Sequence, residues 1–211
     1  MKLYHGSKQI ITNPIVKGSK EDNDYGPAFY MTTDLRSAHQ WACRNSVVGV
    51  VNCYSMNLEG LNILDLTDKA KYSVLNWLAI LLHFRHLDNS FRNSFSERIK
   101  FIEEQYYVPV DQYDVVIGYR ADDAYFRFPL DFVVGNITLE QLEESFMLGE
   151  LGTQVVIVSE KAIKRLVFKK SIDSPESFID DYHENVMAAT ERYNKLNKNQ
   201  KGTRIFNLMG M

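Results

Sequence analysis

Three short stretches carry the most specific information in this sequence: LYHGS at 3–7, GPAFY at 26–30 and TQVVIV at 153–158. The first and the last are compact apolar runs that predict strands. The middle stretch is a Gly-Pro turn that leads into an aromatic strand. Trp41 follows Tyr30 by eleven residues. The order and the spacing of these stretches are more specific as a signal than any one stretch alone.

Apolar periodicity divides the remaining chain into strands and helices. Compact β-branched or aromatic runs predict strands, and apolar residues at every third or fourth position predict helices. The alternating stretch 61–66 is expected to pair beside the strand at 47–55, and the polar segment 17–25 is interpreted as a surface loop. The predicted strands are 2–4, 28–32, 47–55, 61–66, 113–119, 154–159 and 166–169, and the predicted helices are 34–45, 68–87, 96–106, 122–133, 138–148 and 160–165.

The chain changes character after residue 171. Ser174 and Pro175 are typical of a helix start, because Ser caps the first turn and Pro suits the first helical position. Apolar residues then recur every three or four positions from Phe178 to Leu196, which predicts an amphipathic helix of about six turns. The segment from Arg192 to Met211 is basic, and we expect its last ten residues to be mobile or docked on a partner. We therefore divide the chain into 1–171 and an appended C-terminal helix and tail, 172–211.

Composition excludes several classes of protein. The 211 residues are 45% hydrophobic and 24% charged with a net charge of −3, which is typical of a folded globular protein without a basic excess for nucleic acid. Cys43 and Cys53 cannot form a disulfide framework, and His83 and His86 lack a third ligand for a metal. The N-terminus lacks the apolar core of a signal peptide, and the most apolar run, 77–82, is too short to span a bilayer. We expect a soluble, cytoplasmic protein with no membrane partner.

The three stretches together resemble the ADP-ribosyltransferase superfamily, in the branch of diphtheria toxin and the poly(ADP-ribose) polymerases with a His-Tyr-Glu signature. His5 matches the His-Gly-Ser or His-Gly-Thr of the first core strand, Tyr30 matches the second signature residue, and Gln154 stands where the third is usually Glu. The resemblance covers about residues 2–170.

Three further features narrow the resemblance. They are DVVIG at 114–118, ADD at 121–123 and the Gln at 154. Together they look most like an uncharacterised bacterial family of the domain-of-unknown-function kind. The resemblance implies an α+β fold, with a split, twisted β-core flanked by helices over residues 1–171.

The resemblance also implies NAD as the substrate and assigns residues to it. His5 would hydrogen-bond a ribose hydroxyl, and Gly6 would clamp the nicotinamide carboxamide with its N–H and C=O. Ser7 belongs to the same NAD-binding turn. Tyr30 and Trp41 would hold the two faces of the nicotinamide ring, where each aromatic pair contributes about 0.5–1.5 kcal/mol beyond area burial. No dinucleotide Gly-rich motif is present, so that NAD would not be bound in the Rossmann manner.

Gln154 is the main departure from the family pattern. Its carboxamide can hydrogen-bond the ribose 2′-OH, but it cannot supply negative charge to an oxocarbenium-like ribose. The residue therefore predicts a slow enzyme, an inactive one, or one in which another carboxylate takes over, with Glu150, Asp122 and Asp123 as candidates. Ala28, where relatives tend to have Gly, is a second departure, which matters only if the turn requires a positive φ.

The expected function is that of an NAD-dependent mono-ADP-ribosyltransferase, a glycosyltransferase that needs no metal, with His5, Tyr30 and Gln154 as its catalytic set. Its acceptor is a protein, a nucleic acid or a small molecule. The alternative is a catalytically weak or inactive module of the same fold that binds NAD or ADP-ribose, which Gln154 favours. A third hypothesis is a bacterial toxin-type effector whose partner is an antitoxin or regulatory protein that docks on the tail after Ser174.

Overall fold

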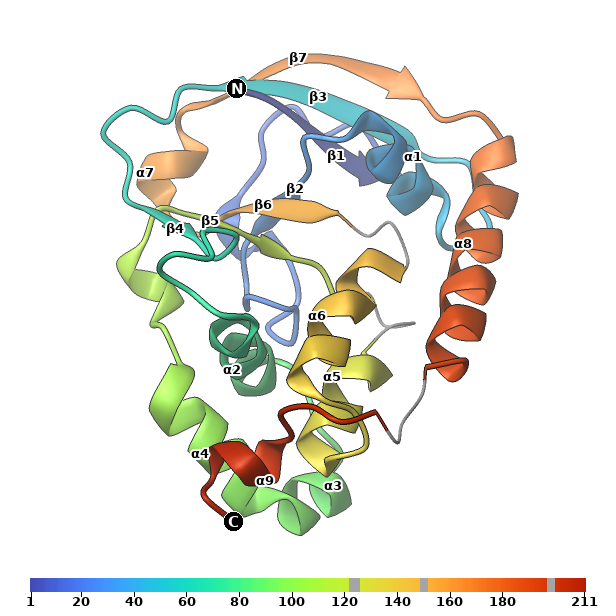
Figure 1. Ribbon diagram of the computed structural model, residues 1–211. Helices are drawn as coiled ribbons and strands as arrows, with labels where there is room; N and C mark the ends of the chain where they lie inside the picture. Colours follow the sequence, from blue (N-terminus) through green and yellow to red (C-terminus); the bar gives the residue numbers. More distant parts are fainter. Residues whose placement is uncertain (122–125, 149–151, 197–199) are drawn as a thin grey trace.

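Two β-sheets form the centre of the computed structural model, which describes residues 1–121, 126–148, 152–196 and 200–211 (Figure 1). The first sheet has the order β1-β3-β7, and the second has the order β2-β6-β5-β4. The strands are β1 (Lys2–Ser7), β2 (Phe29–Met31), β3 (Val50–Met56), β4 (Ile63–Asp65), β5 (Val115–Tyr119), β6 (Thr153–Ile157) and β7 (Leu166–Asp173).

Helices surround both sheets, so that the predicted α+β class is confirmed. Figure 1 shows α1 beside the upper sheet, with α2 and α4 to α6 gathered below the second sheet. The helices of the described residues are α1 (Leu35–Cys43), α2 (Val74–Phe84), α3 (Asn89–Ser94), α4 (Ser96–Tyr106), α5 (Arg127–Val134), α6 (Leu139–Leu148), α7 (Glu160–Ile163), α8 (Ser177–Asn194) and α9 (Ile205–Leu208), with 3-10 turns η1 (Val16–Gly18) and η2 (Val110–Gln112).

Local signals explain where several helices begin. Asp34 caps α1, because its side chain accepts a hydrogen bond from the Ser37 N–H. α2 begins later than predicted, at Val74, because Ser73 and Asn76 form a capping box there. α3 was not predicted, although Asp88 caps it by accepting from two backbone N–H groups.

Within the described ranges, one isolated bridge between β1 and the residue after β2 joins the two sheets. The N–H of Tyr4 donates to the Thr32 carbonyl at 2.8 Å, and the N–H of Thr32 donates to the Tyr4 carbonyl at 2.9 Å. In the described ranges these are the backbone bonds that join the two strands, and β1 continues beyond them alongside β3. The core is therefore split between β1 and β2.

The prediction that 61–66 pairs beside 47–55 is wrong. β4 pairs with β5 in parallel, with Ile63 opposite Val115, and lies in the other sheet. The reason is that β3 has no open edge, because β1 occupies one side of it and β7 the other. The helices α2 to α4 form the crossover that a parallel pair requires.

The C-terminal segment shares the main hydrophobic core. Ala189 and Tyr193 of α8 and Ile205 of α9 are buried in the same cluster as Trp77 of α2. The expectation that the last residues are mobile or docked on a partner is wrong for α9, because this helix packs on its own chain (Figure 1). The boundary that we drew at 171 falls within β7, and both sides of it contribute to one cluster.

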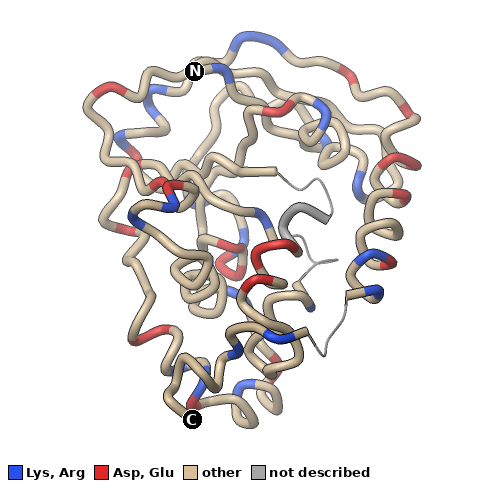
Figure 2. Tube along the Cα trace, in the orientation of Figure 1, with Lys and Arg blue, Asp and Glu red and all other residues tan. Residues whose placement is uncertain are grey.

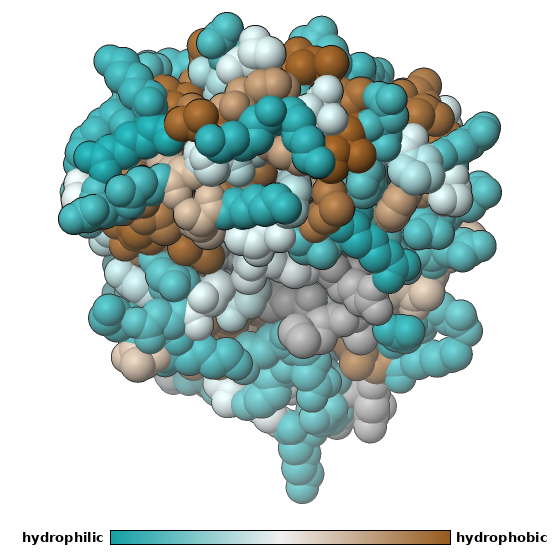
Figure 3. Space-filling view, turned by 90° about the horizontal axis from the view of Figure 1, so that it is seen from above, coloured by the Kyte–Doolittle hydropathy of each residue, from teal (hydrophilic) through white to brown (hydrophobic). Residues whose placement is uncertain are grey.

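The surface mixes charges of both signs. Figure 2 shows acidic and basic residues interspersed along the chain, and Figure 3 shows apolar patches between hydrophilic side chains on the upper face. Val167 of β7 is one of the exposed apolar residues. Among the described residues, no helix combines the length and the apolarity that crossing a bilayer requires.

Candidate functional site

A cavity of about 680 Å³ opens where β1 and β2 diverge. This volume lies within the range of roughly 300–1,000 Å³ that is common for small-molecule sites. The cavity wall includes five of the six predicted site residues, namely His5, Gly6, Tyr30, Trp41 and Gln154. They come from β1, β2, α1 and β6, and the fold brings them together across the split in the core.

His5 is held by the neighbouring strand. Its Nδ1 lies 2.7 Å from the Tyr30 carbonyl oxygen, which can only accept, so that Nδ1 carries the hydrogen. This tautomer leaves Nε2 as an acceptor. The ring stacks on Phe29 with 4.5 Å between centroids, and burial lowers the pKa of His5. A neutral imidazole in one orientation therefore stands in the cavity wall.

Gly6 presents an open strand edge to the cavity. Residues two apart in a strand direct their N–H and C=O groups to the same side. The N–H and C=O of Gly6 therefore point to the side on which Tyr4 bonds Thr32. At Gly6, β2 has already turned away. A Cβ on Gly6 would lie 2.1 Å from the Ala38 carbonyl oxygen, so glycine is also what lets α1 pack against β1.

Ser7 is engaged outside the cavity wall. Its hydroxyl donates to the Gln9 carbonyl at 2.5 Å and accepts from Asn52 Nδ2 at 3.0 Å. Asn52 is fully buried, and its Oδ1 accepts from the Ile11 N–H at 2.8 Å. Asn52 therefore holds the loop after β1, a role that its place in an apolar strand run did not reveal.

Tyr30 holds the turn that precedes its own strand. Its hydroxyl donates to the Gly26 carbonyl at 2.6 Å and accepts from the Tyr25 N–H at 3.1 Å. Burial raises the pKa of Tyr30 well above its usual value, so that the phenol keeps its proton. The positive φ of this turn, 74°, lies at Gly26, and Ala28 therefore fits without strain.

Trp41 forms a cationic wall together with two arginines. The Arg44 guanidinium lies 3.7 Å from the centroid of the indole, and the Arg120 guanidinium lies 5.2 Å from it. A guanidinium over an indole is a favourable cation–π contact. Tyr30 and Trp41 both line the cavity, and a flat ring that stacks on Trp41 would share the indole with these cations.

Gln154 contacts a carboxylate that the sequence analysis missed. Its Nε2 donates to Asp24 Oδ2 and to the Tyr119 carbonyl oxygen, each at 3.1 Å. Asp24 Oδ2 also accepts from the Ala121 N–H at 2.9 Å, and Arg85 Nη1 lies 3.7 Å from Oδ1. Burial raises the pKa of Asp24 to about 6. The carboxylates that we had named as substitutes, Glu150, Asp122 and Asp123, lie outside the described residues.

The position of Asp24 follows from its neighbour Tyr25. The Tyr25 ring lies over Gly118 of β5, where a Cβ would be 2.1 Å from its hydroxyl oxygen. That hydroxyl donates to the Tyr119 carbonyl at 2.9 Å. The surface-loop interpretation of 17–25 is therefore wrong at its end, because Asp24 and Tyr25 are buried. A sequence signal was present in Gly118, the small residue that admits the ring.

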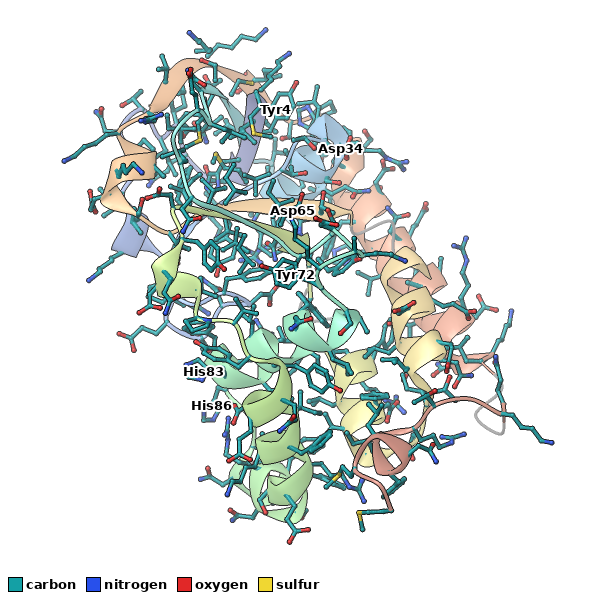
Figure 4. All side chains as sticks on the ribbon, turned by 60° about the vertical axis from the view of Figure 1, so that its left-hand side comes forward. Tyr4, Asp34, Asp65, Tyr72, His83 and His86 are labelled. Carbon is teal, nitrogen blue, oxygen red and sulfur yellow. The ribbon has the colours of Figure 1, made fainter. Side chains whose placement is uncertain are left out.

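Basic groups dominate the charged part of the wall. The charged residues that line the cavity are Lys20, Arg44, Arg85 and Arg120 against Asp22 and Asp24. This excess favours a ligand with phosphate groups. His86 also lines the cavity, and Figure 4 shows it with His83 where α2 ends. In the described part of the chain, no three His, Cys, Asp or Glu side chains come together as metal ligands.

Comparison with known families assigns this chain to one of them. The model of the family described as "Protein of unknown function (DUF3990)" matches residues 1–168, and the chain belongs to this family. The match agrees with the expected uncharacterised domain family, whereas membership of the ADP-ribosyltransferase superfamily stays a prediction. No curated protein and no solved structure matched the chain.

Proposed function

We propose that the protein is an NAD-dependent mono-ADP-ribosyltransferase. The observation that carries the proposal is the convergence of His5, Gly6, Tyr30, Trp41 and Gln154 on one cavity at the split between the sheets. These residues are the ones to which the resemblance gives roles. The cavity volume, the aromatic wall and the basic lining fit a dinucleotide with a pyrophosphate.

Each residue has a proposed role in binding NAD. The Gly6 N–H and C=O would bond the nicotinamide carboxamide, which supplies one acceptor and one donor. His5 Nε2 would accept from a ribose hydroxyl. Trp41 would contact the nicotinamide ring, and the hydrogen-bonded Tyr30 would keep the wall rigid. The arginines beside Trp41 would bind the phosphates.

The proposed reaction breaks the bond between the nicotinamide ring nitrogen and ribose C1′. The bonding electron pair stays with nicotinamide, and the acceptor nucleophile forms a new bond to C1′ and releases its proton to solvent. Positive charge grows on the ribose during this step, which is why a carboxylate near Gln154 matters.

A second candidate is a module that binds NAD or ADP-ribose without turnover. One observation favours it: Gln154 is neutral, and both of its amide hydrogens are engaged by Asp24 and the Tyr119 carbonyl. Such a module would bind NAD at the same cavity and release no nicotinamide.

The biological setting that we propose is a toxin-type effector with an unknown acceptor and a cognate antitoxin. The test is growth of a host that expresses the wild type or the His5→Ala/Tyr30→Phe variant. Growth arrest by the wild type alone would support this setting. Equal growth at equal protein levels would remove it and leave the enzymatic proposal intact.

The enzymatic proposal is tested by incubating the purified protein with NAD and following free nicotinamide by chromatography, with and without cell lysate. We expect release that disappears in His5→Ala and persists in a surface control, Glu21→Gln. Dependence on lysate would indicate an external acceptor, which mass spectrometry can identify. NAD binding without release would favour the non-catalytic module, and absence of both would refute the proposal.

A further inference from the structure

Asp24 is a buried carboxylate that lines the cavity one hydrogen bond away from Gln154. Only 7% of its surface is exposed. A buried carboxylate is costly to ionise, and such groups in cavities are characteristic of functional sites. A neutral side chain with an oxygen acceptor could bond the Ala121 N–H equally well. Holding the loop therefore does not explain why this position carries a carboxylate.

The contact with Asp24 fixes the orientation of the Gln154 carboxamide. Nε2 has two partners, the Asp24 carboxylate and the Tyr119 carbonyl, and both are acceptors. The amide therefore cannot be turned the other way without placing Oε1 against two oxygens. Within the described ranges Oε1 has no hydrogen-bond partner of its own, and it is left as an acceptor for a ligand.

The surroundings of Asp24 favour its ionised form while burial opposes it. Arg85 at the end of α2 lies 3.7 Å from Oδ1, and Arg120 after β5 also acts on the carboxylate. Among the described residues, the hydroxyls of Tyr25 and Tyr30 are further titratable groups that interact with the Asp24 carboxylate. Both phenols keep their protons, because burial raises the pKa of each. Asp24 is thus the negative charge nearest to Gln154 among the described residues.

We propose that Asp24 takes over the role of the acidic side chain that the resembled family usually has at the position of Gln154. As a positioning residue, Asp24 holds Oε1 of Gln154 toward the ribose. It also supplies the negative charge that Gln154 lacks. This inference rests on the proposed function. In this proposal the negative charge comes from the loop before β2 instead of from β6. The resemblance gives no role to a residue of that loop.

Charge relocation is the test that separates this role from a structural one. We expect Asp24→Asn to lower kcat for nicotinamide release on the order of 100-fold, as removal of one preorganised electrostatic element does, with KM for NAD nearly unchanged. The double variant Asp24→Asn/Gln154→Glu returns a carboxylate to the site and should recover most of kcat. Glu21→Gln, an exposed carboxyl in the same loop, is the matched control. Wild-type kcat in Asp24→Asn, or no recovery in the double variant, would overturn the inference.

A binding measurement keeps the inference testable if the protein turns over no NAD. The probes are 1-methylnicotinamide, a cation, and nicotinamide, its neutral analogue, titrated calorimetrically. We expect the wild type to prefer the cation, Asp24→Asn to lose the preference and the double variant to regain it. If these preferences are observed but the protein turns over no NAD, the proposed enzymatic function is refuted, and the inference that Asp24 supplies negative charge to the cavity still holds. Equal preference in the wild type and Asp24→Asn would overturn the inference.

Discussion

Asp24→Asn should stabilise the folded protein at neutral pH, although it removes a carboxylate that makes three polar contacts. Burial raises the pKa of Asp24 from its usual 3.8 to about 6. At 1.36 kcal/mol for each pKa unit, this rise corresponds to a cost of about 3 kcal/mol for keeping the ionised group in the folded state. Asn cannot ionise and keeps an oxygen for the Ala121 N–H, so the variant avoids this cost.

The sign of the pH dependence follows from the direction of the shift. Folded Asp24 holds its proton more tightly than unfolded Asp24, so its contribution to stability falls as pH rises. The cost is absent below about pH 4 and complete above about pH 6. Burial lowers the pKa of His5 as well, but His5 is present in both proteins and its contribution cancels in the difference. The stability gain of the variant should therefore grow from near zero to about 3 kcal/mol across this window.

The assay is urea unfolding of the wild type and Asp24→Asn at several pH values between about 4 and 8, followed by tryptophan fluorescence from Trp41 and Trp77. The exposed control Glu21→Gln should change the free energy of unfolding by less than about 0.5 kcal/mol. A variant that is less stable than the wild type at neutral pH, or a difference that does not vary with pH, would contradict a net cost of burying the Asp24 carboxylate. A less stable variant would mean that the contacts with Arg85 and Gln154 outweigh the cost of burial, and a difference independent of pH would mean that folding does not shift the pKa of Asp24.

Three further predictions concern the frame around the cavity. Gly6→Ala should destabilise the fold by about 3 kcal/mol in thermal unfolding, because its Cβ would lie 2.1 Å from the Ala38 carbonyl oxygen, and an unchanged Tm would contradict this packing. Asp114→Asn should lose about 2 kcal/mol at neutral pH, because the Lys161 ammonium at 2.8 Å and other donors lower the pKa of Asp114 to about 2. The stabilisation by ionised Asp114 is complete above about pH 4 and is lost as pH falls through about 2. A difference in unfolding free energy between Asp114→Asn and the wild type that persists at the acid end would be inconsistent with this pairing. Tyr193→Phe removes a 2.7 Å bond to a buried carboxylate of α5 and should lower unfolding stability by about 1–2 kcal/mol, a loss that equal urea midpoints would disprove.

The strands of the fold could be predicted because their apolar runs are local. β3, β5 and β6 lie within the predicted stretches to within a few residues. The partner of β4 could not be predicted in this way, since it depends on β3 being occupied on both edges by strands that are distant in the sequence. The same limit applies to α9, whose burial depends on the surfaces of α4 and α5 rather than on its own composition.

The residues that line the cavity could be picked out because the order and the spacing of three short stretches carry the resemblance, and their roles in binding NAD stay a prediction. His5, Gly6, Tyr30, Trp41 and Gln154 line one cavity, as the resemblance implied. Ser7 bonds Asn52 beside it, because the buried amide draws the hydroxyl into the loop after β1. Asp24 was missed because it ends a polar stretch, and its burial is decided by Tyr25 lying over Gly118 from ninety-three residues away.

The proposed function depends on NAD binding in the cavity at the split between β1 and β2. The most direct test is a titration of the isotope-labelled protein with NAD, followed through backbone amide resonances. We expect a saturable shift of the Gly6 amide that is weakened in His5→Ala, while the amides of α9, which packs on α4 and α5, stay unchanged. Absence of any shift at Gly6 with millimolar NAD, or shifts confined to another face of the molecule, would contradict it.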